Sequence, residues 1–139
     1  MVKKALCAAV FVLCATILRS TQPALDAATP AIDVSGRWNL KMDPDYRGNP
    51  GPWVECIFKQ QGEQLTVKCG KGAEMKGQVH GRTVTWGFEK TGIPPAPEDR
   101  VVASHTAELN ESGTGLKGTW RLTSSVLNEK GTFQAKKKP

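Results

Sequence analysis

The chain has 139 residues, which is enough for one small domain. Its formal net charge is +6, and part of this charge comes from three consecutive lysines at positions 136–138. No nucleic-acid-binding motif accompanies the basic charge, so the composition does not indicate a nucleic-acid partner. The lysines near the end are expected to be solvated.

A secretory signal peptide is predicted at the start of the chain. Lys3 and Lys4 precede an apolar run over residues 5–18, and Arg19 follows the run. A positively charged start and a short apolar run are typical of such a leader. About 20 apolar residues are needed to cross a bilayer, so an uncleaved membrane anchor is the less favoured alternative.

We expect residues 1–20 to be the signal peptide, although small residues permit cleavage as late as residue 31. Residues 21–33 are rich in Ala, Pro and Thr and are expected to form a flexible stalk. The mature protein is then secreted or periplasmic, and it does not insert stably into a membrane.

Alternating segments predict strands over residues 34–137. Side chains alternate between the two faces of a strand, so apolar residues at every second position indicate one buried and one solvated face. The expected strands cover about residues 34–42, 53–59, 65–69, 73–80, 82–89, 100–109, 116–123 and 131–137. Residues 91–99 read as a proline-rich loop, and residues 124–130 are a weak helical candidate.

Short strands at regular spacing imply a meander that closes on itself, because an open sheet would leave unpaired edges. We therefore predict an all-β domain, an eight-stranded antiparallel up-and-down β-barrel. The alternation assigns to its interior Trp38, Leu40, Val54, Cys56, Phe58, Leu65, Val67, Cys69, Met75, Gly77, Val79, Val84, Trp86, Phe88, Val101, Ala103, His105, Ala107, Leu109, Leu116, Gly118, Trp120, Leu122, Phe133 and Ala135.

Cys56 and Cys69 remain after removal of the leader, and a single pair in an exported protein is typical of a disulfide. A Gly62-Glu63 loop, with glycine first, predicts a type II′ hairpin. Counting outward from this loop places the two cysteines opposite each other, within disulfide reach. A Gln61-Gly62 loop is the alternative, and it places Cys56 opposite Val67. No metal site is expected, because two further ligands would be needed.

Gly36-Arg37-Trp38 resembles the Gly-x-Trp opening of the calycin superfamily, which includes lipocalins and avidins. The resemblance implies that Trp38 plugs one end of the barrel and that a basic residue from the last strand, expected to be Lys136, packs across it. Val34–Trp38 and Gly131–Lys136 are also similar to the first and last strands of small exported bacterial barrels of avidin-like or lipocalin-like type.

Two segments look like avidins, because Thr83–Phe88 and Trp120–Ser125 resemble strands that carry biotin-contacting tryptophans, and Phe133 falls where a further aromatic residue would sit. The polar half of a biotin site is missing. Glu89 and Ile93 stand where avidins have hydroxyls, Thr91 is kept, Cys69 replaces a Tyr, and Asn39 is displaced by one position. A site without its hydrogen-bond partners loses affinity, so the expected ligand is not biotin.

The candidate ligand-binding residues are Trp86, Phe88, His105, Trp120 and Phe133. Aromatic walls with few polar groups suit a small apolar or aromatic molecule. We expect a cavity between Trp86, Trp120 and Phe133. A closed aromatic core is the alternative. His105 is a candidate to orient a polar ligand, and the favoured alternative is a core or rim histidine bonded to a neighbour.

A second hypothesis is an envelope-associated interaction module with a filled core and no internal ligand. Tyr46 and Trp53 lie in or beside a loop expected at a barrel mouth, where such folds usually bind. They are the candidate contacts for a protein or glycan partner. An enzyme is not expected, because no nucleophile–base set or pair of inward carboxylates can be identified. No cofactor is expected either.

Overall fold

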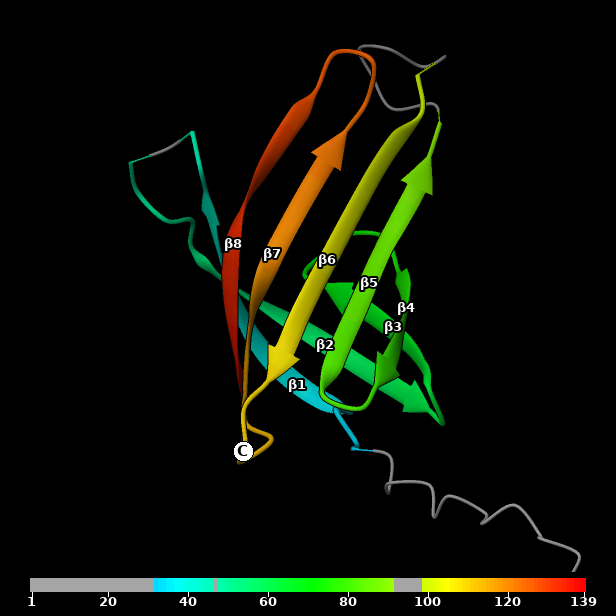
Figure 1. The fold of residues 1–139 in the computed structure, drawn as a ribbon, viewed down its shortest axis with the longest axis vertical. Coiled ribbons are helices and arrows are strands. Elements are labelled where there is room, and N and C mark those ends of the chain that lie inside the picture. The colour runs from blue at the N-terminus through cyan, green and yellow to red at the C-terminus, as the bar shows by residue number, and fades with distance from the viewer. Residues whose placement is uncertain (1–31, 47, 92–98) are drawn as a thin grey trace, which may run out of the picture.

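The computed structural model of the chain describes residues 32–46, 48–91 and 99–139. Eight strands follow one another: β1 (Gly36–Pro44), β2 (Trp53–Gln61), β3 (Gln64–Cys69), β4 (Met75–His80), β5 (Thr83–Lys90), β6 (Val101–Leu109), β7 (Gly115–Thr123) and β8 (Asn128–Lys137). Each strand pairs antiparallel with the next, and β8 pairs with β1, so the sheet closes into a barrel (Figure 1). The predicted all-β up-and-down barrel is confirmed.

The predicted signal peptide and most of the predicted stalk, residues 1–31, lie outside the described residues, as do residues 92–98 of the proline-rich loop. The weak helical candidate over residues 124–130 is wrong. The Ser124 N–H donates to Leu127 O at 2.8 Å, and Ser124 Oγ accepts the Leu127 N–H at 3.0 Å. These bonds close a hairpin turn, and β8 begins directly after it.

The cysteine hairpin has the register predicted from the Gly62-Glu63 loop. Gln61 pairs with Gln64, and Cys56 lies opposite Cys69, with which it forms a disulfide. Gly62 has φ +59°, whereas none of the described residues other than glycine has positive φ, which fits a type II′ turn. The alternative register is therefore wrong. The bridge closes a short loop between residues 13 positions apart, for which the chain-entropy model gives about 3 kcal/mol.

The alternation also places the core correctly. The buried interior contains Val34, Trp38, Leu40, Cys56, Phe58, Leu65, Val67, Met75, Val79, Val84, Trp86, Val101, Ala103, Ala107, Leu109, Leu116, Trp120, Phe133 and Ala135. Of the predicted inward residues, Val54 is exposed, at 37%. Val54 lies at the open end of the barrel, where the interior is not covered. Six others are half-buried: Cys69, Gly77, Phe88, His105, Gly118 and Leu122.

One end of the barrel is closed by the segment that precedes β1. Trp38 and Val34 are completely buried, and Trp38 Nε1 donates to Val34 O at 2.9 Å. The Gln60 side chain clamps the same segment, because its Oε1 accepts the Val34 N–H at 2.8 Å and its Nε2 donates to Ile32 O at 2.9 Å. The plug predicted for Trp38 is thus formed by the indole together with residues 32–35.

The basic residue across this plug is Lys137, and the expectation for Lys136 is corrected. Lys137 pairs with Trp38 across β8 and β1, and its Nζ lies 5.7 Å from the centroid of the indole. Neighbouring residues of a strand point to opposite faces. Lys136 therefore points outward, where its Nζ lies 5.5 Å from the ring of Trp53.

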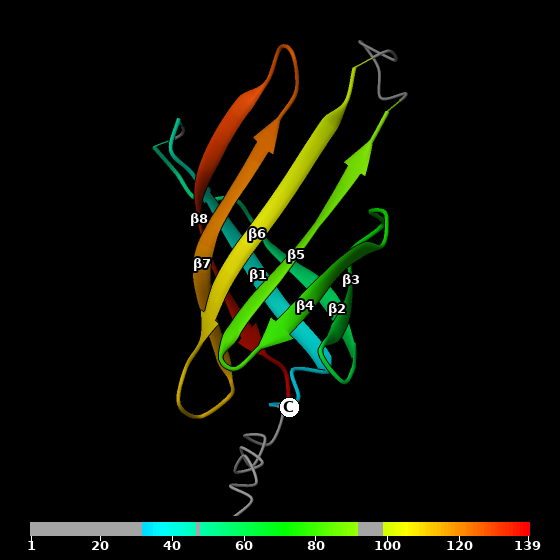
Figure 2. The same cartoon turned by 45° about the vertical axis from the view of Figure 1, so that its right-hand side comes forward.

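The other end is the open mouth. In an up-and-down barrel alternate strand ends share one end of the barrel, so the last residues of β1, β3, β5 and β7 and the first residues of β2, β4, β6 and β8 surround this mouth. Figure 2 shows them at the upper end, opposite the C-terminus, with the β7–β8 hairpin extending well beyond the β3–β4 connection. The open end is therefore the route by which a molecule can reach the interior.

Glycines in the wall allow neighbouring strands to approach closely where the sheet curves. A Cβ on Gly118 would lie 1.9 Å from Thr106 O, which is backbone that cannot move aside alone. We expect Gly118→Ala to lower the free energy of unfolding by about 1–3 kcal/mol, measured by urea denaturation. Gly48→Ala is the control, because nothing lies within 4 Å of its added Cβ. Equal stability of the two variants would contradict close approach at Gly118.

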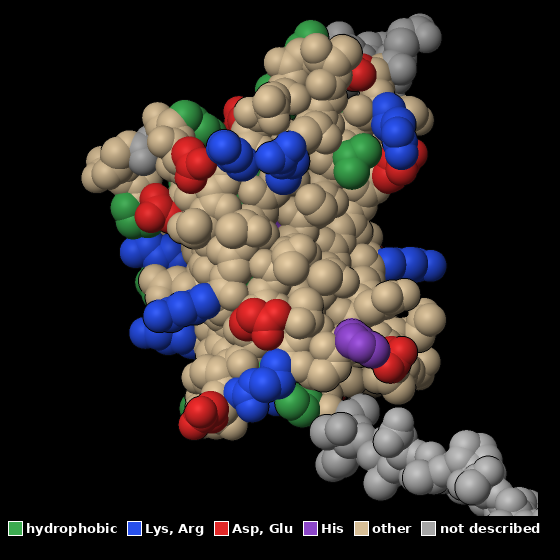
Figure 3. Space-filling model, viewed as in Figure 1, with side chains coloured by type: hydrophobic (Ala, Val, Ile, Leu, Met, Phe, Trp, Pro, Cys, Tyr) green, Lys and Arg blue, Asp and Glu red, His purple; other side chains and the backbone are tan. Residues whose placement is uncertain are grey.

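The outer surface carries charges of both signs. Lys and Arg side chains are interspersed with Asp and Glu on the face shown in Figure 3, and Arg37 and Lys138 both pair with Glu55. No helix of the described residues is long and apolar enough to cross a membrane.

Candidate functional site

An apolar cavity lies in the open mouth of the barrel. Its volume is about 250 Å³, and it is lined by Leu40, Met42, Gly51, Pro52, Val54, Cys69, Met75, Trp86 and His105. The inward alternation of β1 to β6 brings these side chains together, and the turn at Gly51 and Pro52 covers one side. The Gly51 N–H donates to Met42 O at 2.7 Å, which holds this turn against the end of β1.

An aromatic cluster forms the floor of this cavity. The rings of Trp86 and His105, which are paired across β5 and β6, stack with centroids 5.0 Å apart and an interplanar angle of 5°. Phe133 meets both rings edge-on, at 5.3 Å from Trp86 and 5.7 Å from His105. Phe58 lies edge-on to Trp86 at 5.3 Å. These contacts fix the orientation of the Trp86 indole.

His105 is the titratable side chain of the cavity. Burial lowers its pKa to about 4, and the backbone of Trp86 opposes this shift only in part. None of the described residues that line the cavity is an Asp, Glu, Lys or Arg. His105 is consequently a neutral imidazole near neutral pH, and the site presents no net charge to a ligand.

Three buried nitrogen atoms have no hydrogen-bond partner among the described residues. They are Trp86 Nε1, His105 Nδ1 and Trp120 Nε1. Buried polar groups are nearly always hydrogen-bonded in native proteins, so such exceptions require an explanation. Two of the three belong to side chains that line the cavity.

The five candidate residues from the sequence are not arranged around one space. Trp86, His105 and Phe133 form the aromatic cluster, and Trp120 pairs with His105 from β7. The space expected between Trp86, Trp120 and Phe133 is taken up in part by the contact of the Trp86 and Phe133 rings. Phe88 is half-buried and packs against the core without lining the cavity.

The cavity instead lies on the side of Trp86 and His105 that faces β1 to β4. Sequence reasoning did not name Leu40, Met42 or Met75 as site residues. Leu40 and Met75 were recognised as inward-facing from the alternation, but this signal does not separate a packed residue from one that lines a cavity. Met42 continues the alternation of Trp38 and Leu40 at the end of the strand expected over residues 34–42, so the same signal could have identified it as inward-facing.

Tyr46 and Trp53 are not among the residues that line the cavity. Tyr46 is 56% exposed in the β1–β2 connection. Trp53 is the first residue of β2, is 44% exposed, and lies on the outer wall between Lys41 and Lys136, whose Nζ atoms are 5.6 and 5.5 Å from its ring centroid. Trp53 therefore belongs to the outer surface and does not line the mouth.

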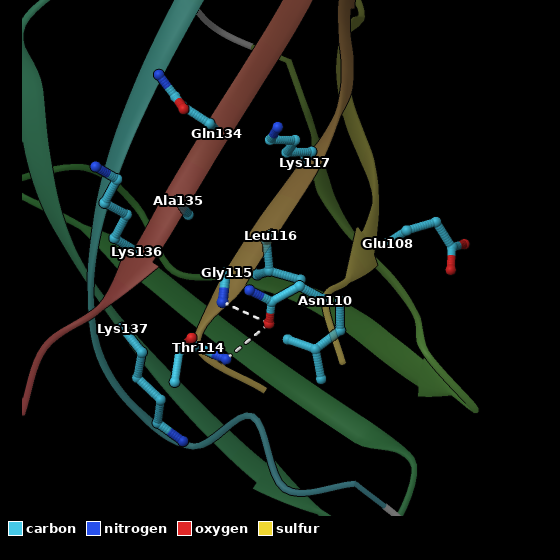
Figure 4. Close-up of a pocket in the computed structure, with 11 residues that line it drawn as sticks. Glu108, Asn110, Thr114, Gly115, Leu116, Lys117, Gln134, Ala135, Lys136 and Lys137 are labelled. Atoms are coloured by element: carbon cyan, nitrogen blue, oxygen red, sulfur yellow. Dashed lines mark hydrogen bonds between the residues drawn. The ribbon is translucent and has the colours of Figure 1, made fainter. Parts of the chain in front are cut away.

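A larger concavity of about 700 Å³ lies on the outside of β6, β7 and β8. Figure 4 shows its lining side chains pointing in different directions, with Lys117, Gln134 and Lys136 separated along the wall. Asn110 is used structurally, because its Oδ1 accepts the N–H groups of Thr114 at 2.9 Å and Gly115 at 3.0 Å. This open surface lacks the convergent groups that define a binding site.

No protein-family model, curated protein or solved structure matches this chain. Across the described part of the chain, His, Cys, Asp and Glu side chains do not gather in groups of three or more that could hold a metal ion.

Proposed function

We propose that this protein is an exported, calycin-like barrel that binds a small apolar or aromatic molecule, other than biotin, in its open mouth. The observation that carries the proposal is the cavity of about 250 Å³ with an almost wholly apolar lining. A cavity of about 150 Å³ lined by apolar side chains binds benzene. The mouth cavity is therefore suited to a molecule of one or two fused rings.

The calycin-like assignment and the export are supported by separate features. Trp38 closes one end of the barrel with Lys137 across it, in agreement with the role that the Gly36-Arg37-Trp38 resemblance implies. The Cys56–Cys69 disulfide is typical of a secreted or periplasmic protein. The predicted signal peptide leads to the same compartments.

A ligand different from biotin is supported by the positions where avidins carry polar groups. Cys69, which stands where a Tyr is expected, is held in the disulfide and contributes an apolar wall. Glu89 is exposed and pairs with Arg100 on the surface. A binding protein is favoured over an enzyme, because the described lining residues include no hydroxyl, thiol or carboxylate that could attack a substrate.

An interaction module for a protein or glycan is the second candidate function. The exposed Trp53 with Lys41 and Lys136 beside it favours this alternative, since exposed aromatic and basic residues are enriched in interaction sites. In this case the mouth cavity has no ligand, and the contact surface is the outer wall formed by β8, β1 and β2.

A ligand titration with a cavity-filling variant tests the proposal. We expect naphthalene or indole to bind saturably, as measured by calorimetry and by tryptophan fluorescence. Val54→Phe, which extends a rim residue into the cavity, should weaken binding by about tenfold or more. Ile57→Phe is the matched control, because Ile57 is 43% exposed on the outside of the same strand. If neither naphthalene nor indole binds the folded protein saturably, the interaction module is favoured.

A further inference from the structure

We infer that the ligand carries a neutral hydrogen-bond acceptor, such as a ketone or ether oxygen, beside its apolar ring, and that the indole N–H of Trp86 binds this oxygen. The inference rests on the proposed function and deepens it by defining the chemical class of the ligand. It follows from a buried indole N–H, on a side chain that lines the cavity, that has no acceptor among the described residues.

Two buried tryptophans carry unpaired donors. Trp86 and Trp120 are 3% and 7% exposed, and their Nε1 atoms have no partner among the described residues. An indole N–H can only donate, so only an acceptor can satisfy either group. Trp38 shows the ordinary arrangement in the same barrel, because its Nε1 donates to Val34 O at 2.9 Å.

The aromatic side chains beside Trp86 do not accept its N–H. Phe58 and Phe133 meet the indole edge-on and have no acceptor atom. His105 has nitrogen lone pairs, but its ring is parallel to the indole within 5°. A lone pair in the plane of one stacked ring cannot point at an N–H in the plane of the other. The protein side chains that orient Trp86 therefore leave its donor available.

Trp86 lines the cavity, whereas its Nε1 atom is buried. The lining side chains must therefore move aside for an acceptor to reach this nitrogen. Met42 and Met75 line the same cavity. Their unbranched, flexible side chains can shift at little cost. A charged acceptor such as a carboxylate is disfavoured, because none of the described lining residues carries a positive charge that could pair with it.

Matched probes separate this inference from the proposed function. 1-Indanone and indane have nearly the same size and shape, and they differ by one carbonyl oxygen. We expect the full mature protein to bind 1-indanone about tenfold more tightly than indane, which corresponds to about 1.4 kcal/mol. If indane binds equally well or better, the inference is overturned and the proposed function stands. If neither probe binds, the proposed function itself fails.

Two variants test whether the tighter binding of 1-indanone depends on the indole N–H of Trp86. Trp86→Phe should bring the ratio of the two affinities close to one, because it removes the N–H and keeps an aromatic ring. Phe133→Leu is the control, because it alters the same cluster without removing a donor and should weaken both probes while leaving their ratio unchanged. A ratio that survives in Trp86→Phe overturns the assignment to Trp86.

A spectroscopic measurement on the unmodified protein covers the case in which Trp86→Phe does not fold. The chain has four tryptophans, and each gives one indole N–H signal in a ¹⁵N–¹H spectrum. We expect the Trp86 signal to move downfield with 1-indanone and not with indane, as for a newly formed hydrogen bond. An unchanged Trp86 signal in the saturated complex, or a shift of the Trp120 signal alone, overturns the inference.

Discussion

Replacing Trp38 with alanine is expected to lower the free energy of unfolding by about 3–5 kcal/mol, the range for truncation of a large buried aromatic side chain. Trp38 is completely buried, and its ring lies 5.5 Å from that of Phe58. Its Nε1 also holds the Val34 carbonyl, so the variant loses the contact that keeps residues 32–35 across the closed end. Urea denaturation followed by circular dichroism measures the loss.

Two further variants separate packing from hydrogen bonding at this end. Trp38→Phe keeps most of the packing and removes the hydrogen bond to Val34 O. The lost hydrogen bond should lower the free energy of unfolding by about 1 kcal/mol, in addition to the loss that comes from the smaller ring. Lys137→Ala removes the cation beside the indole and the long hydrogen bond from Lys137 Nζ to Asp33 O at 3.5 Å, and it should cost less than about 1 kcal/mol. If Trp38→Ala loses no more than Trp38→Phe, packing of the indole does not seal the barrel.

The stability of the protein is expected to fall when the pH is lowered from about 7 to about 4, because of His105. Burial lowers the pKa of His105 from 6.5 to about 4. Between these values the unfolded chain binds a proton that the folded barrel does not, so the unfolded state gains stability as the pH falls. Below pH 4 this loss is complete and lowers the free energy of unfolding by about 3 kcal/mol.

His105→Phe tests this origin, because it removes the titrating group and keeps an aromatic ring on Trp86. The variant should lose the slope of the unfolding free energy between pH 6.5 and 4. His80→Gln should retain the slope, because His80 is exposed. Hydrogen bonds from Lys138 and Arg37 hold the pKa of Glu55 below its usual range. Protonation of this carboxylate therefore affects stability at a lower pH than protonation of His105 in the unfolded chain. A slope that persists unchanged in His105→Phe contradicts the role of His105.

Local signals in the sequence were sufficient for the strands and for the disulfide. Alternation at every second residue depends only on strand geometry, which is why the interior was predicted almost residue by residue. The register of the cysteine hairpin follows from a turn of two residues, in which Gly62 supplies the positive φ. Both inferences use contacts between residues that are close in the chain.

The pairing that closes the barrel could not be predicted in the same way. β8 and β1 are far apart in the chain, and no short turn defines their register. The resemblance to calycins indicated Lys136 beside Trp38, whereas the actual pairing places Lys137 there. A shift of one residue reverses the face to which a strand residue points, so Lys136 lies outside beside Trp53 instead.

By itself, the sequence determined an eight-stranded barrel with one disulfide and an aromatic interior. Only the tertiary structure decided where that interior is filled and where it is open. The stacking of His105 on Trp86 and the edge contacts of Phe133 fill the space between the later strands. The space remains open toward the earlier strands, where Met42 of β1 and Met75 of β4 line the cavity. Alternation shows which way a side chain points, but a cavity depends on how side-chain volumes from distant strands meet.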